Sequence, residues 1–380
     1  MRMLFTFAGG RGHLEPLVPI ARAAQGAGHT VAVAGQALLL EAVRAFGFAA
    51  LTAGARVGRL NKSPLLPPEP EREELALARS YAGWIARGRA ADLLAVCAEW
   101  RPDLLVCDEF DFGAMIVAER LGLPHATVLV SAAGSFVRKE VIADPLNMLR
   151  ADHGLPPDDA VAMTARHLVL SPFPPRFRDP AAPGGENLRW TPADAAAAEV
   201  SEFTKKRPLL YVTLGTVFNL ESGDLFQRVL AGLRALPANA LVTVGEQLSP
   251  AELAEQPAHI RIAGFIPQGK ILPQCSAVLS HGGSGTVMGA LAHGLPQVLI
   301  PMGADQPHNA ARCVALGLGL VLDPIVATPE MVRAAVATVL SDPAYRLAAG
   351  RMRDDIAALP PPSHAVALLE RLSAGRTTSC

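Results

Sequence analysis

The feature that most constrains the fold is a repeated alternation of short apolar segments with segments of helical periodicity. The chain opens with the apolar run Met3–Ala8, then a glycine turn, a helical segment and a second apolar run at Thr30–Ala34. A long helix is predicted at Leu75–Trp100, followed by strands at Asp103–Cys107 and His125–Val130. Because continuously apolar strands that alternate with helices form parallel sheets covered on both faces, the pattern predicts a doubly wound α/β domain.

The alternation stops in the proline-rich stretch Pro172–Glu186, which can hold neither a helix nor a central strand, and then begins again. The second series of strands is expected at Leu209–Leu214, Ala240–Val244, Ile260–Ala263, Ala277–Ser280, Gln297–Ile300 and Leu320–Leu322. The sequence thus predicts two α/β domains, 1–190 and 208–361, that face one another across a cleft and are joined by a linker at 191–207. A long loop is expected at Asp144–Ala165 in the first domain.

The composition excludes several classes of protein. The 380 residues hold 34 lysines and arginines against 35 aspartates and glutamates, so the chain has no basic field to bind nucleic acid or anionic lipid. Charged residues make up 18% and apolar residues 50%, which excludes a mainly disordered chain. Prolines and glycines interrupt the uncharged stretch between Lys270 and Asp305, and the N-terminal apolar run is too short for a signal peptide, so no membrane insertion is expected. The five scattered cysteines indicate free thiols and a cytoplasmic protein.

The sharpest chemical signal is SHGGSGT, Ser280–Thr286, between a predicted buried strand and a predicted helix. Its three glycines let backbone N–H groups approach a ligand, and the start of the helix adds partial positive charge. His281 offers a further hydrogen-bond donor. The segment suits a pyrophosphate, with a tight turn around a satisfied histidine as the structural alternative. It lacks the ending of a P-loop and the GxGxxG of a dinucleotide site.

Two further turns follow predicted strands of the second domain and would face the same crevice. Gly215 and Thr216 can supply N–H and O–H donors. Asp305 and Gln306 can bind several hydroxyls at once, because a carboxylate accepts hydrogen bonds while an amide both donates and accepts them. Helix capping is the alternative role for Asp305.

In the first domain, His13 and Asp108 both follow predicted strands at the carboxyl edge of the sheet. A carboxylate on one imidazole nitrogen fixes the tautomer and raises the basicity of the other nitrogen, which is the layout of a general base. Glu109 and Asp111 are rival carboxylates. A turn histidine and a helix-capping aspartate remain the structural alternative. Since no serine or cysteine elbow lies nearby, His13 would activate a substrate group.

Apolar loops of the first domain could line a pocket for a second substrate. Asn61–Pro70 and Ser135–Met148 are the candidates for these loops. Their side chains that suit a flat or lipophilic molecule are Leu65, Leu66, Phe136 and Val137. The histidines lack metal-ligand spacing and an acidic partner set, so no metal centre is expected.

These segments resemble nucleotide-sugar-dependent glycosyltransferases of the GT-B fold. Within that group they are most similar to the bacterial enzymes that glycosylate natural products, together with macrolide and plant secondary-metabolite glycosyltransferases. Gly12–Ala34 resembles their opening segment, and Val106–His125 resembles the segment that carries their second catalytic residue. Ser280–Ala310 is similar to their donor-binding signature. The resemblance spans essentially the whole chain.

The resemblance implies that His13 deprotonates an acceptor hydroxyl, that Asp108 is its charge partner, and that a last helix at 362–380 crosses back to the first domain. It also implies a donor site: the pyrophosphate on Thr216, His281, Gly282, Gly283, Ser284, Gly285 and Thr286, the nucleotide base on Phe265, Ile266 and Gln268, and the sugar on Asp305 and Gln306. The plant enzymes carry a glutamate for the ribose hydroxyls where this chain has Gly289. A thymidine donor is therefore as plausible as a uridine donor.

The sequence thus predicts an inverting glycosyltransferase that moves a sugar from a TDP- or UDP-sugar to a small lipophilic natural-product aglycone, with no metal or other cofactor. The alternatives are a GT-B-fold sugar-nucleotide epimerase and a non-catalytic sugar-nucleotide-binding protein that assists a partner enzyme. A nicotinamide oxidoreductase is disfavoured, because Gly9–Gly12 lacks the GxGxxG spacing. The oligomeric state, monomer or homodimer, stays open.

Overall fold

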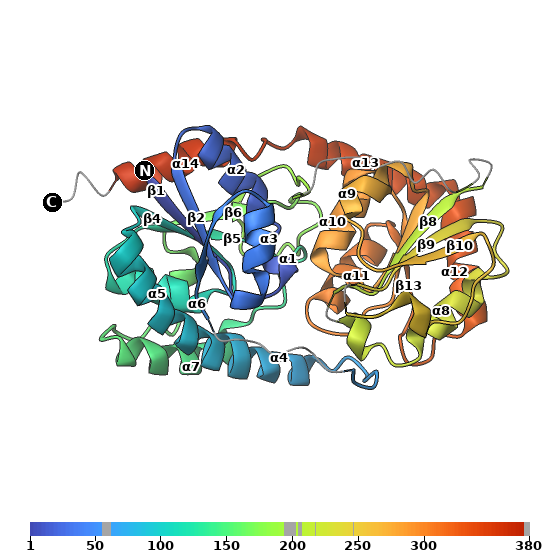
Figure 1. Ribbon diagram of the computed structural model, residues 1–380, viewed down its shortest axis with the longest axis horizontal. Coiled ribbons are helices and arrows are strands. Elements are labelled where there is room, and N and C mark those ends of the chain that lie inside the picture. The colour runs from blue at the N-terminus through green and yellow to red at the C-terminus, as the bar shows by residue number, and fades with distance from the viewer. Residues whose placement is uncertain (55–61, 194–202, 204–206, 217, 246, 376–380) are drawn as a thin grey trace.

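The computed structural model describes residues 1–54, 62–193, 203, 207–216, 218–245 and 247–375. It shows two parallel sheets, each flanked by helices, side by side along the long axis of the molecule (Figure 1). The strand order is β3-β2-β1-β4-β5-β6-β7 in the first sheet and β10-β9-β8-β11-β12-β13 in the second. We call the parts built on these sheets the N-terminal and the C-terminal domain. The predicted α/β architecture of two doubly wound sheets is confirmed.

The bounds of the elements are as follows. The strands of the first sheet are β1 (Arg2–Thr6), β2 (Thr30–Gly35), β3 (Ala49–Thr52), β4 (Leu104–Asp108), β5 (His125–Val128), β6 (Leu168–Ser171) and β7 (Glu186–Asn187). Those of the second are β8 (Leu209–Thr213), β9 (Asn239–Thr243), β10 (Ile260–Ala263), β11 (Ala277–Ser280), β12 (Gln297–Leu299) and β13 (Gly319–Val321). The helices before β8 are α1 (Arg11–Leu14), α2 (Val18–Gly26), α3 (Leu40–Ala45), α4 (Pro70–Arg79), α5 (Ala86–Trp100), α6 (Phe112–Arg120) and α7 (Lys139–Asp152). Those after it are α8 (Leu225–Leu233), α9 (Gln268–Ile271), α10 (Ser284–Ala292), α11 (Gln306–Ala315), α12 (Pro329–Ser341), α13 (Pro343–Ala358) and α14 (His364–Ala374).

The winding of both sheets determines where a site can form. Each sheet starts from a central strand and winds first to one side and then to the other, so the order reverses between β1 and β4 and between β8 and β11. At such a reversal the connections leave in opposite directions and open a crevice at the carboxyl ends of the strands. His13 follows β1 and Asp108 ends β4, while Thr216 follows β8 and His281 follows β11. The topology therefore places all four residues at the two crevices.

Each domain has its own core, and a further apolar cluster joins the two domains. In that cluster Leu129, Phe173 and Phe177 of the N-terminal domain pack with Met288 and Leu299 of the C-terminal domain, all nearly or fully buried. Burial of these side chains stabilises the contact between the domains by the same hydrophobic effect that holds each core.

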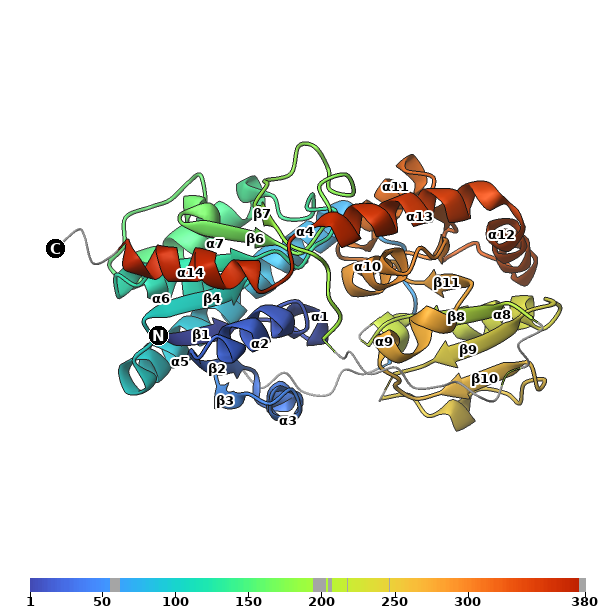
Figure 2. The same cartoon turned by 90° about the horizontal axis from the view of Figure 1, so that it is seen from above.

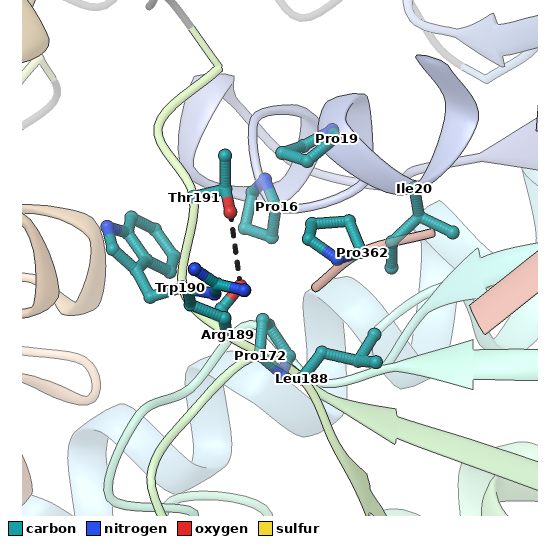
Figure 3. A pocket seen from close by; sticks show the side chains of 9 residues that line it. All are labelled: Pro16, Pro19, Ile20, Pro172, Leu188, Arg189, Trp190, Thr191 and Pro362. Carbon is teal, nitrogen blue, oxygen red and sulfur yellow. Dashed lines mark hydrogen bonds between the residues drawn. The ribbon is translucent and has the colours of Figure 1, made fainter. Parts of the chain in front are cut away.

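The chain also crosses between the domains near its end. α13 lies on the C-terminal domain, and α14 packs on α2 and β6 of the N-terminal domain (Figure 2). Pro362, between them, lines a small cavity of about 10 Å³ together with Pro16 and Pro19 and the outgoing segment Arg189–Thr191 (Figure 3). The backbone N–H of Arg189 donates to the carbonyl of Pro360 at 2.7 Å, so the outgoing and returning segments are tied together. Most of the predicted linker, residues 194–202 and 204–206, lies outside the described residues.

Two sequence predictions about helices were wrong in detail. The stretch expected as a loop at Asp144–Ala165 contains most of α7, because Ile142, Leu146 and Leu149 form one buried face that outweighs a proline at position 145. The helix predicted at Leu75–Trp100 is three segments, since a π-helical turn interrupts it at residues 80–85. Apolar periodicity cannot detect such a turn, which inserts a residue without changing the composition.

A buried ion pair of α5 and α6 gives a stability prediction. Arg89 makes two hydrogen bonds to the carboxylate of Asp111, at 2.8 and 2.6 Å, and both side chains are excluded from solvent. Arg89→Met would leave Asp111 buried without a counter-charge, and we expect it to lower the free energy of unfolding by about 3–5 kcal/mol. Urea unfolding measures this loss.

The exposed ion pair between Arg87 of α5 and Asp152 of α7 provides the matched control. Arg87→Met should cost less than about 1 kcal/mol, because exposed ion pairs are screened by water and salt. Equal losses in the two variants would contradict this account.

Candidate active site

A cleft of about 480 Å³ lies between the domains, a volume that suits a small-molecule site. His13, Tyr81 and Phe110 line its N-terminal wall. The predicted donor residues that line its C-terminal wall are Thr216, Phe265, Ile266, Gln268, His281, Gly283, Ser284, Gly285, Thr286, Asp305 and Gln306. Gly282 lies just behind this wall and does not line the cleft.

The N-terminal wall carries a histidine–carboxylate pair. Nδ1 of His13 lies 3.2 Å from Oδ1 of Asp108, and Asp108 also accepts the backbone N–H groups of Ala8 and Phe110, each at 2.7 Å. Because an ionised carboxylate only accepts hydrogen bonds, we assign the proton to Nδ1 and the lone pair to Nε2. A side chain at residue 9 would meet the imidazole at 2.2 Å, so Gly9 is required for this placement.

The environment of His13 alters its acid–base behaviour. Burial lowers the pKa of His13, but the charge of Asp108 and its hydrogen bond raise it more, with smaller contributions from Glu109 and Asp305. The pKa of His13 is therefore raised above its usual value near 6.5. The side chain is a stronger base than a free histidine, in the position that the resemblance implies.

The two rival carboxylates have other partners. Glu109 accepts the backbone N–H groups of Val130 and Ser131, at 3.2 and 2.6 Å. Asp111 is paired with Arg89 and accepts a hydrogen bond at the start of α6. Asp108 is thus the carboxylate that contacts His13.

The opposite wall is the start of α10. Its first helical hydrogen bond runs from the N–H of Val287 to the carbonyl of Gly283 at 3.0 Å, so the N–H groups of Ser284, Gly285 and Thr286 precede it. These residues line the cleft, and the positive end of the helix dipole points into it. An anionic group such as a diphosphate fits this wall.

His281 supports the same wall from β11. A side chain at residue 215 or 283 would meet its Nε2 at 2.7 or 2.5 Å, so glycine is required on both sides of the ring. Burial lowers the pKa of His281 to about 4, which keeps the ring neutral at neutral pH. Its buried Nδ1 has no hydrogen-bond partner within the described part of the chain. The ring can therefore offer an N–H to a ligand without carrying a charge.

The hydroxyl of Ser284 is engaged by three groups of the protein. It donates to Oδ2 of Asp305 at 2.6 Å and accepts from the amide of Asn309 at 3.1 Å. It also accepts the backbone N–H of Ala132, from the other domain, at 2.6 Å. Only the backbone N–H of Ser284 remains for an anion. Its side chain instead joins the domains and fixes Asp305.

The two predicted sugar-binding residues are held at the start of α11. Burial raises the pKa of Asp305, against the lowering effect of the hydrogen bonds from Ser284 and Asn309. Oε1 of Gln306 accepts the backbone N–H groups of Met302 and Gly303, at 2.8 and 3.3 Å. Both side chains line the cleft and are fixed in place.

The predicted base-binding residues line the same wall. Nε2 of Gln268 donates to the hydroxyl of Thr286 at 2.8 Å, which connects this segment to α10. The guanidinium of Arg11, from the N-terminal domain, lies 4.8 Å from the ring centre of Phe265. Arg11 is the first residue of α1, two residues before His13. An arginine at this place in the sequence does not by itself predict a cation–π contact across the cleft.

The predicted acceptor residues are mostly elsewhere. Phe136 lines the cleft, but Leu65, Leu66 and Val137 do not. Leu65 packs on the core of the C-terminal domain, Val137 packs on the core of the N-terminal domain, and Leu66 is 53% exposed. Loop composition gives no direction for a side chain, and the structure brings one of the four predicted residues to the cleft.

Tyr81 and Phe110 line the cleft but were not predicted. Both rings contact His13, with centroids 5.4 and 5.2 Å from the imidazole. Tyr81 lies in the π-helical turn, where the 3.6-residue period of an α-helix does not give the direction of a side chain. The one feature of the sequence that could have drawn attention to Tyr81 is that the chain has only three tyrosines.

The described residues contain no group of three or more histidine, cysteine, aspartate or glutamate side chains placed to hold a metal ion. No helix among them has both the length and the apolar composition needed to span a membrane.

Comparisons with known proteins identify the family. Residues 227–372 match the family described as "Erythromycin biosynthesis protein CIII-like, C-terminal domain". Tylactone mycaminosyltransferase of Streptomyces fradiae is 30% identical, over 98% of this chain and 93% of its own. L-demethylnoviosyl transferase of Streptomyces niveus is 31% identical, over 96% of each chain. The chain belongs to the natural-product glycosyltransferases.

The fold of this glycosyltransferase agrees with that assignment. It superposes on the spinosyn rhamnosyltransferase SpnG, solved in complex with thymidine diphosphate, with a TM-score of 0.80. The two are 26% identical, and the match covers 97% of this chain and all of SpnG. The enzyme therefore has the GT-B fold that the sequence predicted. Neither curated relative is named as an epimerase or as a helper protein, so those alternatives are not favoured.

The pairing of His13 with Asp108 gives a testable prediction. Asp108→Asn removes the charge that raises the pKa of His13, and we expect that pKa to fall. NMR titration of the labelled imidazole measures it. Glu109→Gln, which removes a weaker and more distant charge, should lower the pKa less. An unchanged pKa in Asp108→Asn would show that Asp108 does not control His13.

Proposed function

We propose that this glycosyltransferase moves a sugar with inversion from a TDP-sugar to a hydroxyl of a small lipophilic natural product, with His13 as the general base. One observation carries the proposal. Nε2 of His13, which carries the lone pair, faces the cleft from one domain, and the start of α10 faces it from the other. A base and an anion site on opposite walls are what direct displacement at a sugar carbon requires.

In the proposed reaction, Nε2 of His13 takes the proton of the acceptor hydroxyl as its oxygen attacks the anomeric carbon. The bond from that carbon to the diphosphate breaks on the opposite face, and its electron pair leaves with the diphosphate. Attack from the opposite face inverts the anomeric configuration. Asp108 stabilises the imidazolium that forms.

The leaving diphosphate would be stabilised by donors already in place. The backbone N–H groups at the start of α10, the ring of His281 and the hydroxyl of Thr216 are candidates for this role. Preorganised donors in a partly closed site stabilise developing negative charge without reorganisation. We therefore propose that catalysis needs no metal ion.

The donor would lie along the C-terminal wall, with its sugar on Asp305 and Gln306 and its base near Phe265, Ile266 and Gln268. A side chain at position 289 would meet Leu272 at 3.0 Å, so this wall has little room for a carboxylate that could bind ribose hydroxyls. A deoxyribose needs fewer such contacts. Together with the thymidine diphosphate bound to SpnG, this supports TDP over UDP.

The acceptor would lie along the N-terminal wall. Tyr81, Phe110 and Phe136 form a series of neighbouring rings there, with centroid distances of 5.3 and 6.2 Å. Their apolar faces suit a lipophilic acceptor and give it binding energy that is independent of the transferred hydroxyl.

Removal of the base tests the mechanism. We expect His13→Ala to lower kcat by about 10²- to 10⁴-fold, since this is the usual contribution of a positioned base, and to leave TDP binding unchanged. Because the base must be neutral and its pKa is raised, kcat/KM of the wild type should fall as the pH drops through a value above 6.5. Near-normal turnover of His13→Ala, measured by TDP release, would exclude His13 as the base.

Ligand-dependent unfolding tests the donor. A ligand at 100 times its Kd adds about 2.7 kcal/mol to the native state, which is enough to raise Tm measurably. We expect TDP to raise Tm more than UDP does, with or without EDTA. Gly283→Ala should abolish the rise, because a methyl group there would displace His281, whereas Gly184→Ala, with no neighbour within 4 Å, should keep it. A rise that depends on metal, or that only UDP causes, would contradict the proposal.

A further inference from the structure

The nitrogen that the proposed mechanism needs already has a partner in this structure. The hydroxyl of Tyr81 lies 3.3 Å from Nε2 of His13, and the two rings are nearly parallel, at 10°. Since Nδ1 holds its proton toward Asp108, Nε2 can only accept. The phenol of Tyr81 is therefore the donor, and it occupies the lone pair that would receive the acceptor's proton.

The backbone brings Tyr81 to this place by an irregular turn. The π-helical segment Ser80–Ile85 joins α4 to α5, and Gly83 within it has φ −102° and ψ −108°, far from helical values. Such an inserted residue turns the following helix and re-aims the side chains before it. π-helical turns are frequent at functional sites, and here the turn directs Tyr81 onto the base.

Neighbouring groups keep the phenol in place as a donor. Phe110 packs against both rings, with centroids 5.2 Å from His13 and 5.3 Å from Tyr81. Burial, and next the charge of Asp108, hold the pKa of the Tyr81 phenol well above its usual value. The hydroxyl keeps its proton at any pH at which the enzyme works.

We propose that Tyr81 is a positioning residue that occupies the lone pair of the base until an acceptor hydroxyl displaces it, and that it thereby limits transfer of the sugar to water. The proposal rests on the proposed role of His13. In the reaction that Tyr81 suppresses, water gives a proton to Nε2 and its oxygen bonds to the anomeric carbon. The bond from that carbon to the diphosphate then breaks, which yields free sugar and TDP.

The strength of the contact suits a group that must be displaced. At 3.3 Å the contact is longer than the usual hydrogen bond of a hydroxyl donor, so it is weak. An acceptor that packs on Phe110 and Phe136 gains apolar burial with which to displace the phenol, whereas water gains none. The contact thus discriminates between acceptor and water without blocking the acceptor.

Hydrolysis of TDP-glucose without any acceptor tests the proposal, with TDP release as the measurement. Tyr81→Phe keeps the ring and removes only the hydroxyl, and we expect it to speed hydrolysis by about 2- to 10-fold, the range of one neutral hydrogen bond. Tyr345→Phe is the matched control, because its ring packs on the core of the C-terminal domain away from the cleft, and it should leave the rate unchanged. The double variant His13→Ala/Tyr81→Phe should hydrolyse as slowly as His13→Ala.

The pKa of His13, measured by NMR in the free enzyme, gives a second result that needs no turnover. Loss of the phenol removes a donor that stabilises the neutral imidazole, so the pKa of His13 should rise in Tyr81→Phe and stay the same in Tyr345→Phe. An unchanged pKa, or unchanged hydrolysis in Tyr81→Phe while His13→Ala is inactive, would overturn the role of Tyr81 alone. Hydrolysis that His13→Ala leaves unchanged would instead overturn the proposed function and, with it, this inference.

Discussion

The site depends on the contact that fixes one domain against the other. The N–H groups of Ala132 and Ala133 donate to Ser284 and Asn309 across the interface, at 2.6 and 3.0 Å. Buried hydrogen bonds of this kind are directional, while the apolar cluster beside them is not. The apolar cluster therefore holds the domains together, and these bonds set the register in which His13 faces α10.

Two histidines, each just after a central strand of its sheet, show how environment separates their chemistry. His13 follows the central strand β1 and has a carboxylate partner, which raises its pKa. His281 follows β11, is half-buried between two glycines without a carboxylate, and has its pKa lowered to about 4. One ring is thus suited to accept a proton, and the other to donate a neutral hydrogen bond. The proposed inverting transfer uses both properties, one on each side of the anomeric carbon.

Residues fixed by strand ends could be predicted from the sequence, and residues placed by tertiary packing could not. The strands Ile260–Ala263 and Ala277–Ser280 were predicted to the residue, and the motifs at strand ends came to the cleft because topology alone puts them there. The position of Leu65 depended on a loop that reaches the other domain, and that of Tyr81 on an inserted residue in a helix. Neither the path of that loop nor the inserted residue changes the local apolar pattern, so the positions of these two side chains could not be derived from that pattern.

The part of the cleft around Asp305, where we propose that the sugar binds, shows the same dependence of one domain on the other. Ala304, just before Asp305, has φ +52°, a conformation that costs a non-glycine residue about 1–2 kcal/mol. Its N–H donates to the carboxylate of Glu73 on α4, at 3.3 Å, and Glu73 belongs to the N-terminal domain. A strained backbone persists where its surroundings determine it, and here part of those surroundings lies across the cleft. The C-terminal domain alone therefore lacks one of the contacts that hold Asp305 in place, and the proposed sugar position is complete only when the domains are together.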